Sequence, residues 1–338
     1  METIYLTSGE EDLRRAAALL CAGEVVAIPT ETVYGLAADA RNGEAVAAVF
    51  KAKGRPADNP LIVHIARREQ LEGLVRDIPP VAEALAAAFW PGPLTMIFNK
   101  ADNIPAVVSA GLDTVAIRMP SHEIARHIID LSCPLAAPSA NRSGSPSPTE
   151  AKRVVQDLDG RIAAVVDGGA CEVGVESTVV DVTGERVRLL RPGAVTVEML
   201  RTVAGDVEVD DAVLHRLRDG AVAASPGMKY KHYAPAARVI LIKGNAAAYT
   251  AYVNAHAENG CMALCFDGEE TGLTVPHLTY GARDDHAAQA RQVFEALRLL
   301  DERGATLAYT ACPTPDGVGL AVYNRLLRAA GFEVIELD

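Results

Sequence analysis

Residues 25–40 read VVAIPTETVYGLAADA, an apolar run that stops at a proline and continues into small and polar residues. A short run rich in Val and Ala that ends at a turn residue is typical of a buried β-strand. Loops at strand ends are favoured ligand sites. The stretch therefore predicts a strand followed by a loop that places Thr30, Glu31, Thr32 and Tyr34 at a pocket. An N-cap and turn with a buried tyrosine is the plainer alternative.

Similar apolar runs alternate with amphipathic helical patterns through about residue 205. The strand candidates are VVAIP, LIVHI, LTMIF, TVAIRMP, PLAAP, AAVVDG, STVVDV and VRLLRP. The helical candidates are Glu11 to Ala22, Glu44 to Lys53, Val81 to Phe89 and His122 to Leu131. Strands mixed with helices in this way predict the α/β class with α+β character, and a twisted mixed sheet in a first domain at residues 1–205.

The composition changes between residues 206 and 236, where Pro and Gly punctuate SPGMKYKHYAP. This change is typical of an interdomain linker. Residues 237–338 then repeat a β-α-β rhythm, which predicts a small, Rossmann-like α/β domain. No GxxxxGK[ST] motif occurs, and GVGLAV at residues 317–322 lacks the third glycine of the dinucleotide fingerprint, so a P-loop or NAD enzyme is disfavoured.

Composition and charge exclude several other classes. The chain has 338 residues and is 49% hydrophobic, which is enough for two domains with substantial cores. A formal net charge of -12 works against a protein that holds nucleic acid mainly through its phosphates. The N-terminus lacks the pattern of a signal peptide and no apolar run reaches the roughly 18 residues of a membrane span, so we expect a cytoplasmic protein.

The cysteines and histidines do not form a metal motif. None of the six cysteines forms a CxxC pair, so reduced, buried thiols are expected. His122 and His127 stand five positions apart, whereas the histidines of a zinc helix stand four apart and share a face. We therefore expect no metal held by the protein alone.

The segment KAKGRPADNPLIVHI, residues 51–65, carries several cations around a helix that ends at glycine. Cations at a helix C-terminus answer the macrodipole, which accounts for Lys51 and Lys53. It does not account for Arg55, which precedes a proline and whose planar guanidinium matches a phosphate. The segment therefore predicts an anion-binding site.

A second polar segment, APSANRSGSPSPTEAKRV, follows the apolar PLAA. Ser147, Pro148 and Glu150 read as a capping box that starts a helix at Pro148. Ser139 and Asn141 have no such structural explanation. Hydroxyls and amides that lead into a helix N-terminus form a natural phosphate-binding region.

Arg118 lies within the apolar run VAIRMP, where an unpaired charge is costly. It therefore meets a carboxylate, which is either structural, from Asp or Glu, or functional, from a substrate. The residues alone favour neither. Thr114, Ser177 and Arg191 also lie in or beside strands.

Taken in order, the loops resemble the YrdC-like domain. The matching segments are PTETVYGLAADA, KGRPADNPLIVHI, PGPLT, AIRMP, APSANRSGSPSPT, ESTVVD and LLRPG. The linker SPGMKYKHYAP with a small α/β domain after it resembles the long, two-domain form of the threonylcarbamoyl-AMP synthase family. The resemblance spans essentially the whole chain.

This resemblance implies an enzyme that condenses L-threonine, bicarbonate and ATP. The threonine amine captures bicarbonate as a carbamate, whose oxygen attacks the α-phosphate of ATP and releases pyrophosphate. Mg²⁺ enters with the ATP. A downstream transferase passes the threonylcarbamoyl group to tRNAs that read ANN codons, so the chain is expected to need no stable contact with nucleic acid and none with a membrane.

The resemblance also assigns residues to the two substrates. Lys53 and Arg55 are the implied catalytic residues. They belong to a larger implied ATP-binding set: Lys53, Arg55, Asn59, Thr114, Ser139, Asn141, Ser147, Arg191 and Tyr233. Tyr233 and its neighbours match a segment that lies over the nucleotide in this family, which implies that the linker at residues 206–236 is also a lid. The threonine-binding set is Thr32, His64, Arg118 and Ser177. His64 is also a candidate base, but a threonine-orienting or core role is as good an interpretation, so no base is assigned.

Two alternatives use related domains. A carbamoyl transferase of hydrogenase maturation also carries acylphosphatase-like and zinc modules, which this sequence lacks. An RNA-binding or regulatory YrdC-like protein predicts a basic concave face, which the acidic total charge disfavours.

Overall fold

The structure is a computed structural model that describes residues 2–216 and 232–337. The described residues fall into two compact units. Residues 2–143 and 147–213 form the first, and residues 144–146, 214–216 and 232–337 form the second. Most of the segment SPGMKYKHYAP lies outside the described residues.

The first unit is built on a mixed sheet with the strand order β1-β8-β2-β3-β7-β4-β6-β5-β9-β10-β11. The sheet contains both parallel pairs, such as β4 with β6, and antiparallel pairs, such as β5 with β6. The strands are β1 (Ile4–Leu6), β2 (Val26–Ile28), β3 (Gly35–Asp39), β4 (Ile62–His64), β5 (Leu94–Asn99), β6 (Thr114–Arg118), β7 (Leu135–Ala136), β8 (Ala164–Val166), β9 (Thr178–Asp181), β10 (Val187–Arg191) and β11 (Val207–Val209).

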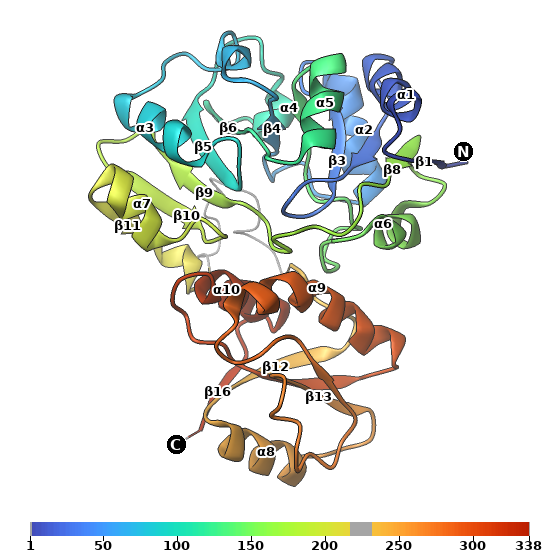
Figure 1. Cartoon of the computed structure of the whole chain (residues 1–338), viewed down its shortest axis with the longest axis vertical. Coiled ribbons are helices and arrows are strands. Elements are labelled where there is room, and N and C mark those ends of the chain that lie inside the picture. Colours follow the sequence, from blue (N-terminus) through green and yellow to red (C-terminus); the bar gives the residue numbers. More distant parts are fainter. Residues whose placement is uncertain (1, 217–231, 338) are drawn as a thin grey trace. The chain divides into compact units, whose positions relative to one another are not determined.

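Helices occupy the connections of this sheet (Figure 1). The α-helices are α1 (Glu10–Cys21), α2 (Gly43–Lys53), α3 (Pro80–Phe89), α4 (Ala106–Ser109), α5 (Glu123–Leu131), α6 (Ala151–Leu158) and α7 (Val197–Ala204), with short 3₁₀ turns at Arg68–Leu71 and Asp211–Val213. The four helical candidates from the sequence correspond to α1, α2, α3 and α5 within one residue at each end. Helix α2 ends as expected at Gly54, whose φ of 63° is the left-handed conformation that glycine adopts most easily.

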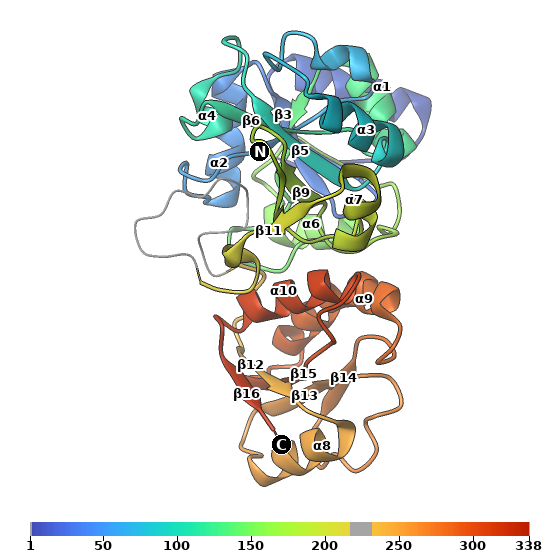
Figure 2. The same ribbon diagram turned by 90° about the vertical axis from the view of Figure 1, so that its left-hand side faces the viewer.

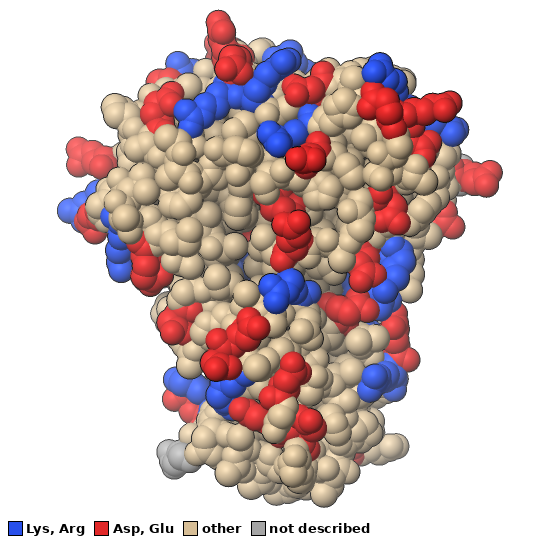
Figure 3. All heavy atoms as spheres, viewed as in Figure 1, with Lys and Arg blue, Asp and Glu red and all other residues tan. Residues whose placement is uncertain are grey.

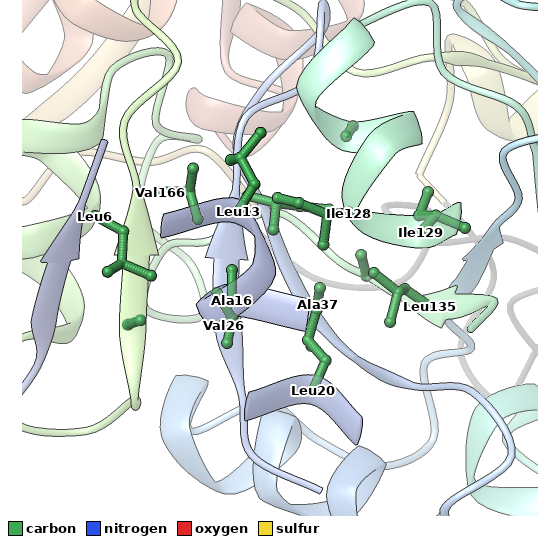
Figure 4. Packing of buried hydrophobic residues seen from close by; sticks show 14 of the residues in the cluster. Leu6, Leu13, Ala16, Leu20, Val26, Ala37, Ile128, Ile129, Leu135 and Val166 are labelled. Atoms are coloured by element: carbon green, nitrogen blue, oxygen red, sulfur yellow. The ribbon is translucent and has the colours of Figure 1, made fainter. Parts of the chain in front are cut away.

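Strand β2 shows why the sheet needs helices on both sides. Successive side chains of a strand point to opposite faces. Val26 and Ile28 pack with α1 and α5 (Figure 4), whereas Val25 and Ala27 pack with α2 and α6. All four side chains are buried. The apolar run that opened the sequence analysis is therefore a strand covered on both faces, and the predicted mixed α/β sheet is confirmed.

All eight strand candidates of the first domain are strands in the structure. The sequence prediction missed β1, β3 and β11. It treated GLAADA as loop, but β3 forms an antiparallel hairpin with β2. Three of its five residues are Ala or Gly, which have low strand propensity, and burial between β2 and β7 overrides that preference.

The predicted capping box at Ser147 is wrong. Helix α6 begins at Ala151. The hydroxyl of Ser147 donates to the carboxylate of Glu176, and the Pro148 carbonyl accepts the N–H of Tyr34 at 2.9 Å. These contacts with distant segments hold residues 147–149 outside the helix, so tertiary contacts outweigh the local motif.

The predicted linker, residues 206–236, begins with regular structure. Strand β11 pairs in parallel with β10 and extends the first sheet to residue 209. The domain boundaries at residues 205 and 236 stay a prediction.

The second unit is a parallel sheet with the order β14-β13-β15-β12-β16. Helices α9 and α10 lie on one face and α8 on the other (Figures 1 and 2). In the strand order of dinucleotide-binding domains, the first two strands, here β12 and β13, would be neighbours. In this sheet β15 lies between them, so the strand order differs from that of the dinucleotide-binding fold. The elements are β12 (Arg238–Lys243), α8 (Ala246–Ala255), β13 (Cys261–Cys265), β14 (His277–Thr279), α9 (His286–Glu302), β15 (Leu307–Ala311), α10 (Gly319–Ala329) and β16 (Val334–Glu336).

Two general expectations also meet the structure. Within residues 2–216 and 232–337, no helix combines the length and the apolar character that crossing a membrane requires. All six cysteines are free thiols, but Cys21 is exposed and Cys133 is half-buried, so only four of the six are buried as expected.

The cluster in Figure 4 generates a stability prediction. Leu20 is fully buried between the sheet and α5, so Leu20→Ala leaves a cavity and should lower the free energy of unfolding by about 2–5 kcal/mol. Leu19→Ala makes the same deletion at a partly buried neighbour and should cost less than half as much. Urea unfolding followed by circular dichroism measures both, and equal losses would contradict the packing described.

Candidate active site

Strand register brings several predicted site residues to one edge of the first sheet. His64 ends β4 and pairs with Arg118, which ends β6. Thr95 of β5 also pairs with Arg118, and Leu94 pairs with Thr178 at the start of β9. The neighbouring ends of β4, β6, β5 and β9 therefore carry three of the four residues predicted to bind the substrate threonine: His64, Arg118 and Ser177.

The guanidinium of Arg118 is held from several segments. Its Nη2 lies 2.7 Å from Oε2 of Glu31, and both side chains are 4% exposed. Its Nη1 donates to Oγ1 of Thr32 at 2.8 Å. Thr32 is the fourth of the residues predicted to bind the substrate threonine. The Nε of Arg118 donates to the carbonyl of Gly92 at 3.4 Å. Of the two carboxylate partners expected for Arg118, the structure shows the structural one, Glu31.

This ion pair sets the charge of its surroundings. Burial by itself raises the pKa of Glu31, but the charge of Arg118 and hydrogen bonds to the carboxylate outweigh it and hold that pKa below its ordinary value. Burial, reinforced by Arg118, lowers the pKa of His64 to about 3. His64 is therefore neutral near pH 7, next to a charged pair.

A second group of contacts adjoins the first. The Ser177 hydroxyl lies 2.8 Å from that of Thr95. Arg191 donates from Nε to the Ser177 carbonyl at 3.0 Å and from Nη2 to its hydroxyl at 3.1 Å. Arg191, which is predicted to bind ATP, thus contacts Ser177, which is predicted to bind the substrate threonine. The two predicted sets of residues are therefore in contact at this point.

Lys53 connects two loops, the KGR loop at residues 53–55 and the SAN loop at residues 139–141. Its Nζ donates to the Ser139 carbonyl, to the Asn141 carbonyl at 2.6 Å and to Oδ1 of Asn141 at 3.3 Å. The Ser139 hydroxyl donates to the same Oδ1 at 2.5 Å. Burial, followed by the charge of Arg55, lowers the pKa of Lys53 well below its ordinary value. Lys53 therefore ties the two loops together from below.

Arg55 and Asn59 complete this cluster. Nη2 of Arg55 lies 3.4 Å from the Asn59 carbonyl and 3.3 Å from the Pro60 carbonyl, so the side chain folds over its own loop. The side-chain amide of Asn59 is buried, and neither its nitrogen nor its oxygen has a hydrogen-bond partner. A buried amide without partners in the protein is costly, so Asn59 has donor and acceptor groups that remain to be satisfied by a water, an ion or a ligand.

Three predicted ATP-binding residues, Thr114, Ser147 and Tyr233, are not part of these clusters. Thr114 begins β6 and lies four residues before Arg118, or about 13 Å along an extended strand. Tyr233 belongs to the second unit, where its buried ring packs on Phe294 at 5.2 Å and beneath the guanidinium of Arg325. Their contacts with ATP stay predictions.

The sequence analysis did not assign three residues that contact the predicted site. Glu31 was placed at a pocket but was not assigned to either substrate, and Thr95 and Glu176 were not singled out. Glu176 is 7% exposed and accepts the hydroxyl of Ser147. Its place beside Ser177 in VEST was the available signal. Thr95 looks like an ordinary strand residue, and only the pairing of β5 with β6 and β9 gives it a site.

The arrangement combines two chemistries. The cluster of Lys53, Arg55, Asn59, Ser139 and Asn141 offers cationic and amide donors that suit phosphate oxygens. The cluster of Glu31, Thr32, Arg118, His64 and Ser177 offers both charge signs and hydroxyls to a small polar ligand. The part of the chain that the structure describes contains no group of three or more His, Cys, Asp or Glu side chains arranged to hold a metal ion.

Comparisons with known proteins agree with this arrangement. One family model, described as "Telomere recombination", matches residues 18–193. A second, described as "Threonylcarbamoyl-AMP synthase, C-terminal domain", matches residues 195–331. The Escherichia coli protein YciO shares the fold, with a TM-score of 0.51 and 18% identity over 57% of this chain and 95% of its own.

Relatives that span the whole chain are more similar. The threonylcarbamoyl-AMP synthase of Pyrococcus abyssi is 45% identical over 97% of this chain and 96% of its own, and that of Bacillus subtilis is 44% identical over 98% and 97%. A crystal structure of P. abyssi Sua5 complexed with L-threonine aligns with a TM-score of 0.93 and 43% identity over all of both chains. The chain therefore belongs to the threonylcarbamoyl-AMP synthase family.

Proposed function

We propose that this protein is an L-threonylcarbamoyladenylate synthase, a nucleotidyltransferase that makes threonylcarbamoyl-AMP and pyrophosphate from L-threonine, bicarbonate and ATP. One observation carries the proposal. The first unit holds a cluster of cationic and amide side chains and a buried cluster of both charge signs, and Arg191, which is assigned to ATP, binds Ser177 of the second cluster, in a chain that is 45% identical along its length to a synthase of this name.

The nucleotide is proposed to bind at the KGR and SAN loops. Arg55 and Asn59 contact phosphate oxygens, and the Asn59 amide gains partners that it lacks in the protein itself. Lys53 is held by the carbonyls of Ser139 and Asn141, so we assign it the positioning of the two loops that bind the phosphates. Ser147 and Arg191, which contact Glu176 and Ser177, complete the nucleotide side.

Threonine is proposed to bind at the charged pair. Arg118 is suited to its carboxylate, because a guanidinium presents parallel donors to two oxygens. Thr32 and Ser177 supply hydroxyls, and neutral His64 orients the substrate without adding a charge. Support comes from the relative P. abyssi Sua5, whose crystal structure is a complex with L-threonine.

The reaction requires two steps in sequence. The threonine nitrogen bonds to the carbon of bicarbonate, and water leaves to give the carbamate. A carbamate oxygen then attacks the α-phosphorus of ATP, and the bond to the β-phosphate oxygen breaks to release pyrophosphate. Neither step needs a covalent enzyme intermediate, so catalysis consists of holding three reactants in line and compensating the phosphate charge. The product passes to a transferase that modifies tRNAs reading ANN codons.

We propose that Mg²⁺ arrives on the ATP. Mg²⁺ prefers oxygen ligands and usually combines a few protein groups with substrate phosphates. The nucleotide cluster fits this role, since it presents donors for phosphate oxygens and one buried amide, Asn59, with an oxygen that could face the ion. The ion would then neutralise charge on the leaving pyrophosphate.

An RNA-binding function receives less support. On the face drawn in Figure 3, basic and acidic side chains are intermixed, and the chain as a whole carries a formal charge of -12. Binding to nucleic acid phosphates draws on clustered cations. Of the cations in the clusters described above, Lys53, Arg118 and Arg191 are buried rather than on the surface, which favours a small ligand over a nucleic acid backbone.

The first prediction concerns the reaction itself. Purified protein with L-threonine, bicarbonate and Mg-ATP should release pyrophosphate in a reaction that requires all three substrates, measured by a coupled phosphate assay. Mass spectrometry should identify threonylcarbamoyl-AMP. Pyrophosphate release without threonine, or none with all substrates present, would refute the function.

A second prediction separates the two clusters. Arg55→Ala removes a proposed phosphate contact and should raise the KM for ATP by about tenfold or more, with little effect on the KM for threonine. Arg118→Lys keeps the charge beside Glu31 but loses the guanidinium fork, and should chiefly raise the KM for threonine. Steady-state kinetics with each substrate varied in turn tests both. The reverse pattern would show that the two subsites have been exchanged.

A further inference from the structure

Glu31 is a buried carboxylate to which no role in the reaction has been given. Its Oε1 accepts the backbone N–H of Ser121 at 3.1 Å, and its Oε2 faces Arg118 at 2.7 Å. Its side chain is 4% exposed. A carboxylate buried to this extent is rare unless it is paired.

The imidazoles of His64 and His122 and the thiol of Cys171, which lie near Glu31, carry no charge near pH 7. Burial lowers the pKa of His64 to about 3 and lowers that of His122, while it raises the pKa of the Cys171 thiol to about 12. Exposed Glu172 acts on His122 from the solvent side. Glu31 and Arg118 therefore form a buried pair of opposite charges with no net charge.

A ligand carboxylate bound to Arg118 would upset this balance. It would bring a second negative charge beside Glu31 in a site with little solvent, and like charges this close repel strongly. An α-amino acid avoids the problem, because its ammonium and carboxylate groups are attached to the same carbon and its own charges cancel. With its carboxylate on Arg118, the amino acid would then place its ammonium group beside the carboxylate of Glu31.

We propose that Glu31 binds the ammonium group of threonine while Arg118 binds its carboxylate, so that the buried pair selects a zwitterionic α-amino acid. This rests on the proposed function, and it adds a residue that contacts the substrate. Glu31 acts in binding and not as the base that removes the ammonium proton, because Arg118 stabilises its charged form.

The second buried carboxylate nearby, Glu176, is less suited to this role. It accepts the hydroxyl of Ser147, on the side proposed for the nucleotide. Glu31 instead contacts the guanidinium that would hold the substrate carboxylate. The pairing with Arg118 therefore singles out Glu31.

A binding experiment on the full chain separates recognition of the ammonium group from support of Arg118. Isothermal titration calorimetry compares L-threonine with (2S,3R)-2,3-dihydroxybutanoate, in which a hydroxyl replaces the ammonium group. Both are titrated into the wild type, Glu31→Gln and the control Glu172→Gln, which removes an exposed carboxylate outside the site.

If Glu31 binds the ammonium group, Glu31→Gln should weaken threonine binding by about thirtyfold or more, as expected for loss of one partner of a buried charge pair. The same variant should leave the affinity for dihydroxybutanoate within about threefold of the wild type, or improve it, because the repulsion between carboxylates is gone. Glu172→Gln should change neither. Equal weakening of both ligands by Glu31→Gln would instead show that Glu31 only positions Arg118, and would overturn the proposal.

The wild-type measurements test the idea even if Glu31→Gln does not fold. The wild type should bind threonine at least about thirtyfold more tightly than dihydroxybutanoate, and a difference below about threefold overturns the proposal. The proposed function is refuted as well if the wild type binds ATP, shows no threonine binding in the calorimeter and releases no pyrophosphate in response to threonine. Threonine binding without this discrimination refutes only the role of Glu31.

Discussion

Three buried cations constrain the loops of the first unit. Lys53, Arg118 and Arg191 are 3–6% exposed, and a charge taken out of water must be compensated by polar groups. The groups that do so come from distant segments: the carbonyls of Ser139 and Asn141 for Lys53, Glu31 and Thr32 for Arg118, and Ser177 for Arg191. Each cation therefore fixes a loop that the sheet alone would leave loosely held.

This constraint explains why the site is built at strand ends. The sheet holds the backbone of β4, β5, β6 and β9 in register, and the buried side chains then draw the connecting loops onto that edge. Donors and charges are consequently in place before any substrate arrives. For the reaction proposed above, which consists of positioning three reactants and compensating charge, such preorganisation is the expected source of the catalytic advantage, since little reorganisation remains for the transition state.

Sequence patterns predicted the regular structure best where burial and local preference agree. All eight strand candidates of the first domain were correct, because Val- and Ile-rich runs between turn residues are distinctive. The prediction missed β3, whose small residues do not look like a strand. It also started a helix at Pro148 with Ser147 as its N-cap, whereas the Ser147 hydroxyl binds Glu176 instead. Both errors have the same cause, namely contacts with residues far away in the sequence, which a local motif does not contain.

The sequence by itself determined the α/β class, eight strands and four helices of the first unit, and the types of residue available for an anion and a small polar ligand, since these depend on local periodicity and on motifs within one segment. Only the tertiary structure decided which side chains meet. It paired Arg118 with Glu31 rather than leaving it open between two partners, set Lys53 beneath two carbonyls, and linked Arg191 to Ser177. The physical reason is that a buried charge is satisfied by whatever the fold brings within hydrogen-bond distance, and strand register between distant segments governs that proximity.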